Sequence, residues 1–220
     1  MRIGVATVVA SAIADGIFNY LVSVIGKLSR QFIIHDWHFV PRAAFAADLL
    51  AQDATYTDEE IDEAYRKLLV EVEAVQAEQR KLLTYLIDHH KVRAVYVEGL
   101  TDRDLPIFEA IARTLRKVDK SKGETWLRFG AAGQLYVEGK LPAIKPAEEA
   151  NAYQAANPVN GETVEIDEEA MKRRRQAIVD RLEKEPLAIV VLGVAHDLTP
   201  HVAEGTEYIR LTVPSVPADR

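Results

Sequence analysis

Two histidines stand three residues apart in the stretch FIIHDWHFVPR, residues 32–42, as His35 and His38. The stretch begins with an apolar run typical of a buried strand, and side chains past strand ends in α/β proteins often bind ligands or carry catalysis. On an extended strand the two imidazoles would point to opposite faces, so one site takes both only if the chain turns at Asp36-Trp37. Both are candidate site residues, with ordinary structural histidines as the alternative.

Two later strand-like runs also end in polar groups. VYVEGL, residues 95–100, delivers Glu98, and VVLGVAHDL, residues 190–198, delivers His196. If the strands are parallel neighbours, these side chains and His38 converge at one edge of the sheet. Imidazole and carboxylate are the usual ligands of catalytic Zn²⁺, Mn²⁺ or Co²⁺ ions, and without a metal they form a His–Glu acid/base pair. Singly, the glutamate is equally a cap of the following helix, and the late histidine is equally satisfied by backbone.

A basic run, KRRR at residues 172–175, follows the acidic Asp167, Glu168 and Glu169. This mixture of charges favours the solvent-facing side of a helix. One member of the run, such as Arg174, can turn inward to bind a substrate carboxylate or a developing oxyanion.

The composition is that of one globular domain. At 220 residues the chain is long enough to bury a substantial core, and its net charge of −7 argues against binding nucleic acid. It has no cysteine, which excludes disulfides, thiolate zinc sites and a cysteine nucleophile. It also lacks the G-x-S-x-G, P-loop and G-x-G-x-x-G motifs, so a serine hydrolase or a common nucleotide site is unsupported.

Strand-like and helix-like patterns alternate and predict an α/β fold, a single domain with a mostly parallel central sheet flanked by helices. Buried strands are expected at Phe32–His35, Val92–Glu98 and Leu187–Gly193, and residues 208–213 alternate like an edge or half-exposed strand. Helices are expected at about 57–89, at 106–118 and from Asp167, the last with Met171, Ile178 and Leu182 toward the core. Residues 119–165 are expected to be a loop-rich excursion with short helices.

Residues 1–30 form an apolar N-terminal segment that the sequence leaves open. We expect a buried strand at 3–10, a break at Asp15-Gly16 and then a helix, within a cytoplasmic protein that does not enter the membrane. A membrane span through residues 3–26 would place Asp15 near the bilayer centre, at a cost of a few kcal/mol. An export leader ending at Ala14 would be shorter than such leaders normally are. Export and membrane anchoring are the alternatives.

The series HDWHFVP, VYVEGL, RRRQAIVDRL and VVLGVAHDL resembles the motif order of the TraB/Tiki/ChaN/EreA superfamily over roughly residues 30–213. Gly193 and His196 match the late G-x-x-H of that group. His38, Glu98 and Arg174 match its first histidine, its glutamate and its helix arginine. His35 stands where the pattern has glycine, so it either adds a metal ligand or crowds the site. The resemblance implies an α/β domain over 31–220 with its site at the sheet edge.

Three functions follow from these residues. The first is a hydrolase, metal-assisted or His/Glu-based, that activates water against an ester or amide bond of a small molecule or peptide. His38, Glu98 and His196, with His35 as a further ligand, would hold the metal or act as base. The second, implied by ChaN-like relatives, is haem or ligand binding without turnover, with Tyr96 and Tyr136 as contacts. The third is a catalytically silent interaction domain. The oligomeric state is not indicated.

Overall fold

The structure, a computed structural model, describes residues 6–9, 30–36, 39–90, 92–117, 123–157, 159–160, 163–164, 166–193 and 196–213. These residues form a central sheet of six strands in the order β1-β8-β2-β7-β3-β4, and every neighbouring pair is parallel. The strands are β1 (Ala6–Val9), β2 (Arg30–Asp36), β3 (Ala94–Thr101), β4 (Ala143–Glu148), β7 (Leu187–Gly193) and β8 (Glu207–Thr212). A separate two-stranded antiparallel hairpin joins β5 (Val159–Asn160) to β6 (Thr163–Val164).

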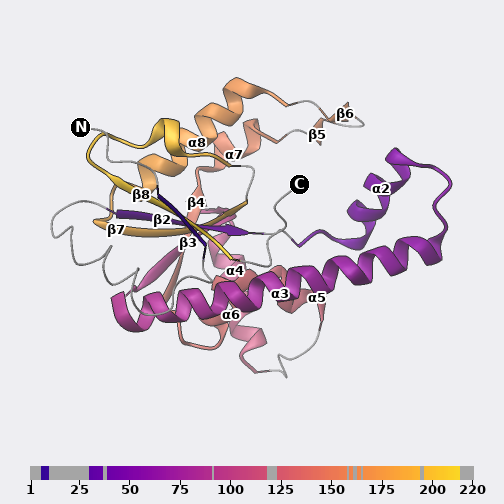
Figure 1. Cartoon of the computed structure of the whole chain (residues 1–220), viewed down its shortest axis with the longest axis horizontal. Helices are drawn as coiled ribbons and strands as arrows, with labels where there is room; N and C mark the ends of the chain where they lie inside the picture. The colour runs from indigo at the N-terminus through magenta and orange to yellow at the C-terminus, as the bar shows by residue number, and fades with distance from the viewer. Residues whose placement is uncertain are drawn as a thin grey trace.

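Helices cover both faces of the sheet (Figure 1). They are α2 (Arg42–Gln52), α3 (Asp58–His90), α4 (Leu105–Leu115), α5 (Glu124–Arg128), α6 (Gly130–Val137), α7 (Ala150–Ala155), α8 (Glu168–Leu182) and the short 3-10 helix η2 (Thr199–His201). On one face α3 and α6 pack against apolar side chains such as Val95 and Val191. On the other face α8 packs against the alternate residues, such as Tyr96 and Val190. The predicted α/β fold with a parallel sheet flanked by helices is therefore confirmed.

The long helix α3 begins where its sequence predicts. The Thr57 N–H donates to a Glu60 carboxylate oxygen at 2.9 Å, and the Glu60 N–H donates back to Thr57 Oγ1 at 3.3 Å, which is a capping box. The last turn holds His89 and His90, which suit the negative end of the helix dipole. Ten residues of its inner stripe are buried, and the first turns project past the sheet beside α2 (Figure 1).

Two expectations about the strands were wrong. Residues 208–213 do not form an edge strand, because β8 pairs with β1 on one side and β2 on the other. The polar Arg210 had suggested exposure, but it is only partly buried while Tyr208, Ile209 and Leu211 are buried. Within the supposed loop-rich excursion, β4 is a strand of the central sheet. Its Pro146 is tolerated because β4 is the edge strand, where a missing N–H leaves no partner unpaired.

The carboxyl ends of three neighbouring strands are aligned by the register. Asp36 at the end of β2 pairs with Gly193 at the end of β7, and Val97 of β3 pairs with Val191 of β7. The β3–β4 register shifts after Val97, and Gly99 has a φ of 73°, which side-chain-bearing residues rarely adopt. This irregularity re-aims the end of β3, and it falls next to Glu98.

The N-terminal segment is described only at β1, which lies inside the strand expected at 3–10. The helix expected after Gly16 lies outside the described residues. None of the helices in the described part of the chain combines the length and apolar character that crossing a bilayer requires.

Candidate active site

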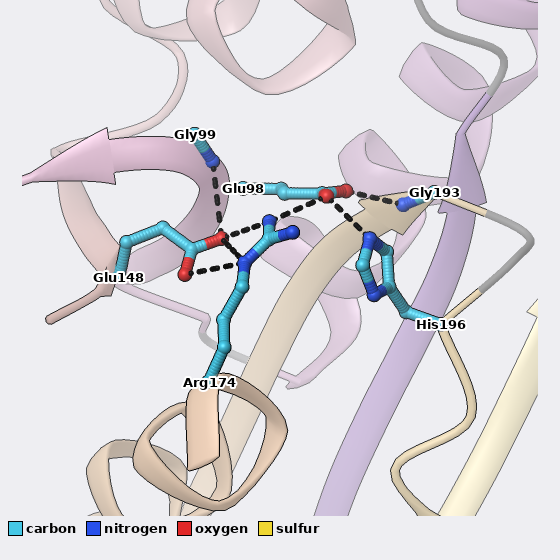
Figure 2. A network of polar contacts seen from close by, with 6 residues as sticks. All are labelled: Glu98, Gly99, Glu148, Arg174, Gly193 and His196. Carbon is cyan, nitrogen blue, oxygen red and sulfur yellow. Dashed lines mark hydrogen bonds and ion pairs between the residues drawn. The ribbon is translucent and has the colours of Figure 1, made fainter. Parts of the chain in front are cut away.

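Side chains from four parts of the fold meet at the carboxyl edge of the sheet (Figure 2). Glu98 comes from β3, Glu148 is the last residue of β4, Arg174 lies on α8, and His196 follows β7 by three residues. Figure 2 shows the guanidinium of Arg174 between the two glutamates, and the imidazole on the far side of Glu98. The cluster brings together residues 98 positions apart along the chain, from 98 to 196.

Glu98 is the centre of the cluster. Its Oε1 accepts a hydrogen bond from Arg174 Nη2 at 2.8 Å and lies 2.8 Å from His196 Nε2. Its Oε2 accepts a hydrogen bond from the Gly193 N–H at 2.6 Å. The Glu98 side chain is only 10% exposed, so these contacts take the place of water around a carboxylate.

Glu148 holds the other side of Arg174. Its two carboxylate oxygens lie 3.2 and 3.1 Å from Arg174 Nε, and Oε1 lies 2.5 Å from Nη2. The Gly99 N–H, at 3.4 Å, is a further donor to Oε1. Glu148 is fully buried, so this bidentate pair fixes the orientation of the guanidinium in a water-poor environment.

Arg174 reaches the cluster because it occupies the buried stripe of α8. Ala170, Arg174, Ile178 and Leu182 follow one another at four-residue spacing and are all buried. The helix is started by Asp167, whose carboxylate accepts from the Ala170 N–H at 2.9 Å. Two other members of the basic run, Lys172 and Arg173, are exposed, and Arg175 is half-buried.

The charges of the cluster do not cancel. Two carboxylates face one guanidinium, so the network carries −2 + 1 = −1 while the imidazole of His196 is neutral. Burial lowers the pKa of Arg174, but the hydrogen bonds and charges of Glu148 and Glu98 outweigh it and raise the pKa above its ordinary value. The guanidinium therefore stays charged. The remaining negative charge favours a further positive charge nearby, such as a bound cation.

The two ring nitrogens of His196 have different surroundings. Nε2 faces Glu98, whereas Nδ1 is buried and has no hydrogen-bond partner within the part of the chain that the structure describes. The backbone N–H of His196 donates to the Gly193 carbonyl at 3.0 Å and so ties the histidine to the end of β7. Because a carboxylate only accepts, Nε2 carries the ring proton of a neutral imidazole, and Nδ1 presents its lone pair.

Arg174 also keeps donor capacity. All of its hydrogen bonds among the described residues come from Nε and Nη2, which leaves the N–H groups of Nη1 available there. The ring of Tyr153 on α7 covers the guanidinium, with its centroid 5.0 Å from Cζ. Burial raises the pKa of the Tyr153 hydroxyl despite the opposing charge of Arg174, so this neighbour stays neutral.

A cavity of about 270 Å³ adjoins Glu98 and is lined by the first turn of α6 and the residues before it. Glu98 belongs both to its lining and to the charged cluster. The remaining lining is mostly apolar, including Phe39, Val97, Phe129 and Val191. The site therefore combines a charged cluster with an adjoining, partly open space whose lining residues are mostly apolar.

The structure brings together three of the five predicted site residues: Glu98, Arg174 and His196. The backbone of His35 lies in β2 opposite Leu192, and its side chain is not among the described parts of the structure. His38 follows the end of β2 by two residues and lies outside the described residues. Within the described ranges no group of three or more histidine and acidic side chains has metal-holding geometry, so the metal stays a prediction that involves His38.

Glu148 is the site residue that the sequence interpretation missed. Its signal was the run AIKPAE, a short strand that ends in a carboxylate as β3 does. The proline within the run disguised the strand. The tyrosines considered as haem contacts lie apart, since Tyr96 packs on the α8 face of the sheet and Tyr136 packs with α4 and α6 on the other.

Comparison of the chain with family models, with curated proteins and with solved structures finds no match. The resemblance to the TraB/Tiki/ChaN/EreA superfamily, which rests on motif order, stays a prediction.

Proposed function

We propose that this edge of the sheet is the active site of a hydrolase that activates water against an ester or amide bond. The observation that carries the proposal is His196, whose Nε2 is held by Glu98 while Nδ1 is buried without a partner among the described residues. An unpaired buried polar atom costs about 1–3 kcal/mol, so a fold that keeps one calls for a functional explanation.

His196 would act as general base through Nδ1. As the oxygen of a water molecule attacks the carbonyl carbon, Nδ1 takes the proton and the ring becomes an imidazolium. Glu98 both orients the ring and stabilises this positive charge, and the imidazolium brings the charge of the cluster from −1 to zero. The same proton then passes to the departing alcohol or amine as the tetrahedral intermediate collapses to the acid. The cluster therefore stabilises the positive charge that develops on the ring during the reaction.

Arg174 would bind the developing oxyanion. Nη1 has N–H groups that no described residue accepts, while Glu148 and Glu98 hold the other nitrogens in place. A donor fixed before the reaction does not have to reorganise as charge develops, which is the condition for strong electrostatic stabilisation. Glu148 acts here as a positioning residue.

A divalent metal fits part of the same arrangement. The lone pair of His196 Nδ1 is not used by any described residue, and the other ring nitrogen faces a carboxylate, the arrangement common for metal-ligating histidines; His38 and His35 would complete the set. When bound, such an ion lowers the pKa of a water molecule toward neutrality and polarises a carbonyl. Glu98 fits better as the residue that orients His196, because both of its oxygens are engaged by Arg174, His196 and Gly193.

The proposal is tested by assaying the protein on p-nitrophenyl esters, amino-acid anilides and peptides. His196→Gln and Glu98→Gln are expected to lose hydrolysis, whereas His201→Gln keeps it. His201 is a matched control because it lies on η2 and contacts Gln176 rather than the cluster. Hydrolysis that persists at the original rate in His196→Gln would contradict the proposal.

Metal analysis of the purified protein separates the two forms of the mechanism. Near-stoichiometric Zn, Mn or Co that is lost in the His38→Ala/His196→Ala double variant supports the metal-assisted form. A protein that stays metal-free after incubation with these ions and still hydrolyses substrate supports direct His–Glu catalysis. Iron accompanied by a Soret band would instead indicate haem binding.

A further inference from the structure

We propose that the cavity beside Glu98 binds the apolar part of the substrate, a group about as large as one aromatic ring with a short linker. The inference rests on the proposed function and adds the class of substrate: a small ester or amide with a compact aromatic or branched side group. It also names the residues on α6 and before it that limit the size of this group.

The cavity adjoins the charged cluster. Glu98 is the residue shared by the cavity lining and the charged cluster, so a ligand that fills the cavity ends at Glu98. Val97 and Val191, neighbours in the β3–β7 register, form the floor on this face of the sheet. His196 and Arg174 do not line the cavity, but both contact Glu98, so a carbonyl attached to the bound group would lie beside the charged cluster.

The lining indicates what the cavity prefers to bind. Three of its residues, Gln76, Glu98 and Arg128, carry polar or charged side chains, and the remainder are apolar residues or glycine. The Gln76 amide is already engaged, because it donates to the Leu127 carbonyl at 2.8 Å and accepts from Gln134 at 2.7 Å. Arg128 is about half exposed. An apolar group inside the cavity therefore gains burial without displacing a hydrogen bond of Gln76.

The volume limits the size of that group. A dry apolar cavity of about 150 Å³ is known to hold benzene, and pockets for drug-sized ligands span roughly 300–1,000 Å³. The cavity of about 270 Å³ lies between these values. Within its walls it has room for one ring with a short linker, or for a branched chain of similar bulk.

The wall on the α6 side is rigid. Gln134 donates to Gln76 and to the Trp126 carbonyl, and Arg80 donates to Gln134 at 3.2 Å and to Glu138 at 2.7 Å. This network of hydrogen bonds ties α3 to the segment that carries the cavity wall. The cavity is therefore formed before a ligand arrives, which lowers the ordering cost of binding.

Ala131 and Ala132 set the depth of the cavity. Both are buried and line it from the first turn of α6, and their small side chains leave the space open. Leu127, which is half-buried, lines it near the more exposed side. A larger residue at 132 should close the cavity, and a smaller residue at 127 should widen it.

The test uses 4-fluorobenzyl alcohol, a ring-sized probe without a bond to hydrolyse, and follows its binding to the full chain by ¹⁹F NMR. Wild-type protein is expected to bind the probe saturably, and Ala132→Leu to bind it at least tenfold more weakly. Ala110→Leu, the same change at an exposed position on α4, is the matched control and should bind like the wild type. Absence of saturable binding to the wild type, or equal binding by Ala132→Leu, overturns the proposal.

A second variant covers the case in which Ala132→Leu does not fold. Leu127→Ala is expected to shift the preference at least threefold from 4-fluorobenzyl alcohol toward the larger 4-fluorobiphenylmethanol. An unchanged preference in a folded Leu127→Ala protein overturns the assignment of the cavity.

The probe distinguishes this inference from the proposed function because its binding needs no catalysis. Probe binding that depends on residue 132, without ester or amide hydrolysis, upholds the cavity as a binding site and removes the hydrolase proposal. Hydrolysis whose rate is indifferent to the size of the substrate's side group, with no probe binding, upholds the hydrolase and overturns the inference.

Discussion

At the scale of single residues, the buried charges Glu98, Glu148 and Arg174 are the feature that most needs an explanation. Taking ions out of water is expensive, and apolar side chains of the same size would often be at least as stable. The fold nevertheless keeps an excess negative charge next to an imidazole nitrogen that has no hydrogen-bond partner among the described residues. The proposed hydrolysis would use both features, because a general base needs a lone pair and a counter-charge for its protonated form.

Replacing Glu98 by glutamine should reduce hydrolysis by about a hundredfold or more, within the range of general acid–base contributions. The amide removes the negative charge that stabilises the imidazolium, but it is nearly the same shape as the carboxylate. We therefore expect a cooperative unfolding transition to be retained, as measured by circular dichroism. Glu73→Gln, on the exposed side of α3, is the control, and full activity in Glu98→Gln would remove Glu98 from the mechanism.

Removing the charge of Arg174 should destabilise the protein by about 3–5 kcal/mol, since Arg174→Met leaves buried carboxylates without their cation. Urea unfolding measures this loss, and the exposed Arg173→Met is the matched control. Adding Glu148→Gln to Arg174→Met should restore about 0.5–3 kcal/mol, because the two residues interact directly. Strictly additive losses in the double variant would show that Glu148 and Arg174 are not coupled.

Sequence reasoning reached Glu98 and His196 because each follows a fully apolar strand, where a charged group is conspicuous. It reached Arg174 as one member of a basic run and through motif resemblance, although an arginine on the four-residue stripe of Ala170, Ile178 and Leu182 is itself a signal. Glu148 could not be predicted as a site residue, because β4 was not predicted to be a strand.

At the scale of elements, α3 is an example of a helix that could be predicted from its local sequence pattern. Its capping box and apolar stripe specify both its start and its buried side. The position of β8 within the sheet could not be predicted in this way, because alternation of polar and apolar residues does not distinguish an interior strand from an edge strand. Pairing partners decide that, and they lie far away in the sequence.

Leu86 is fully buried in the α3 face of the core, so Leu86→Ala should destabilise the protein by about 2–5 kcal/mol. Val70→Ala, at a position of α3 that is 67% exposed, should change stability by no more than about 0.5 kcal/mol. Denaturant unfolding of both variants checks the stripe. Equal effects at the two positions would mean that the buried side of α3 is misassigned.

The buried hydroxyl of Tyr208 on β8 should make the folded protein less stable at alkaline pH. Burial raises the pKa of its hydroxyl from 10.0 to about 12, so the folded state holds the proton more tightly than the unfolded state. The resulting stability is fully present below pH 10 and falls as the pH rises toward 12, by up to about 3 kcal/mol.

Urea unfolding at several alkaline pH values measures this loss against two variants. Tyr208→Phe should lack this part of the decline, while Tyr56→Phe, at an exposed position, should keep it. The same slope in Tyr208→Phe and wild type would contradict the assignment.

At the scale of the whole molecule, the parallel sheet is what assembles the site. Parallel strands place their carboxyl ends at one edge, and the register puts the ends of β2, β7 and β3 side by side. The convergence of Glu98 and His196 was therefore predictable once the fold class was known. The contribution of α8 and β4 was not, since it depends on how those elements pack across the end of the sheet (Figure 2).

The central claim, a histidine held by Glu98 with Nδ1 free to activate water, is tested most directly by the ring nitrogens of His196. Protein labelled with ¹⁵N-histidine, studied by NMR at mildly alkaline pH and assigned with His196→Gln, reports which nitrogen carries the proton. We predict a protonated Nε2 and an unprotonated Nδ1, whether or not a metal is bound. A proton on Nδ1 with a bare Nε2 would contradict the Glu98–His196 pair and the mechanism built on it.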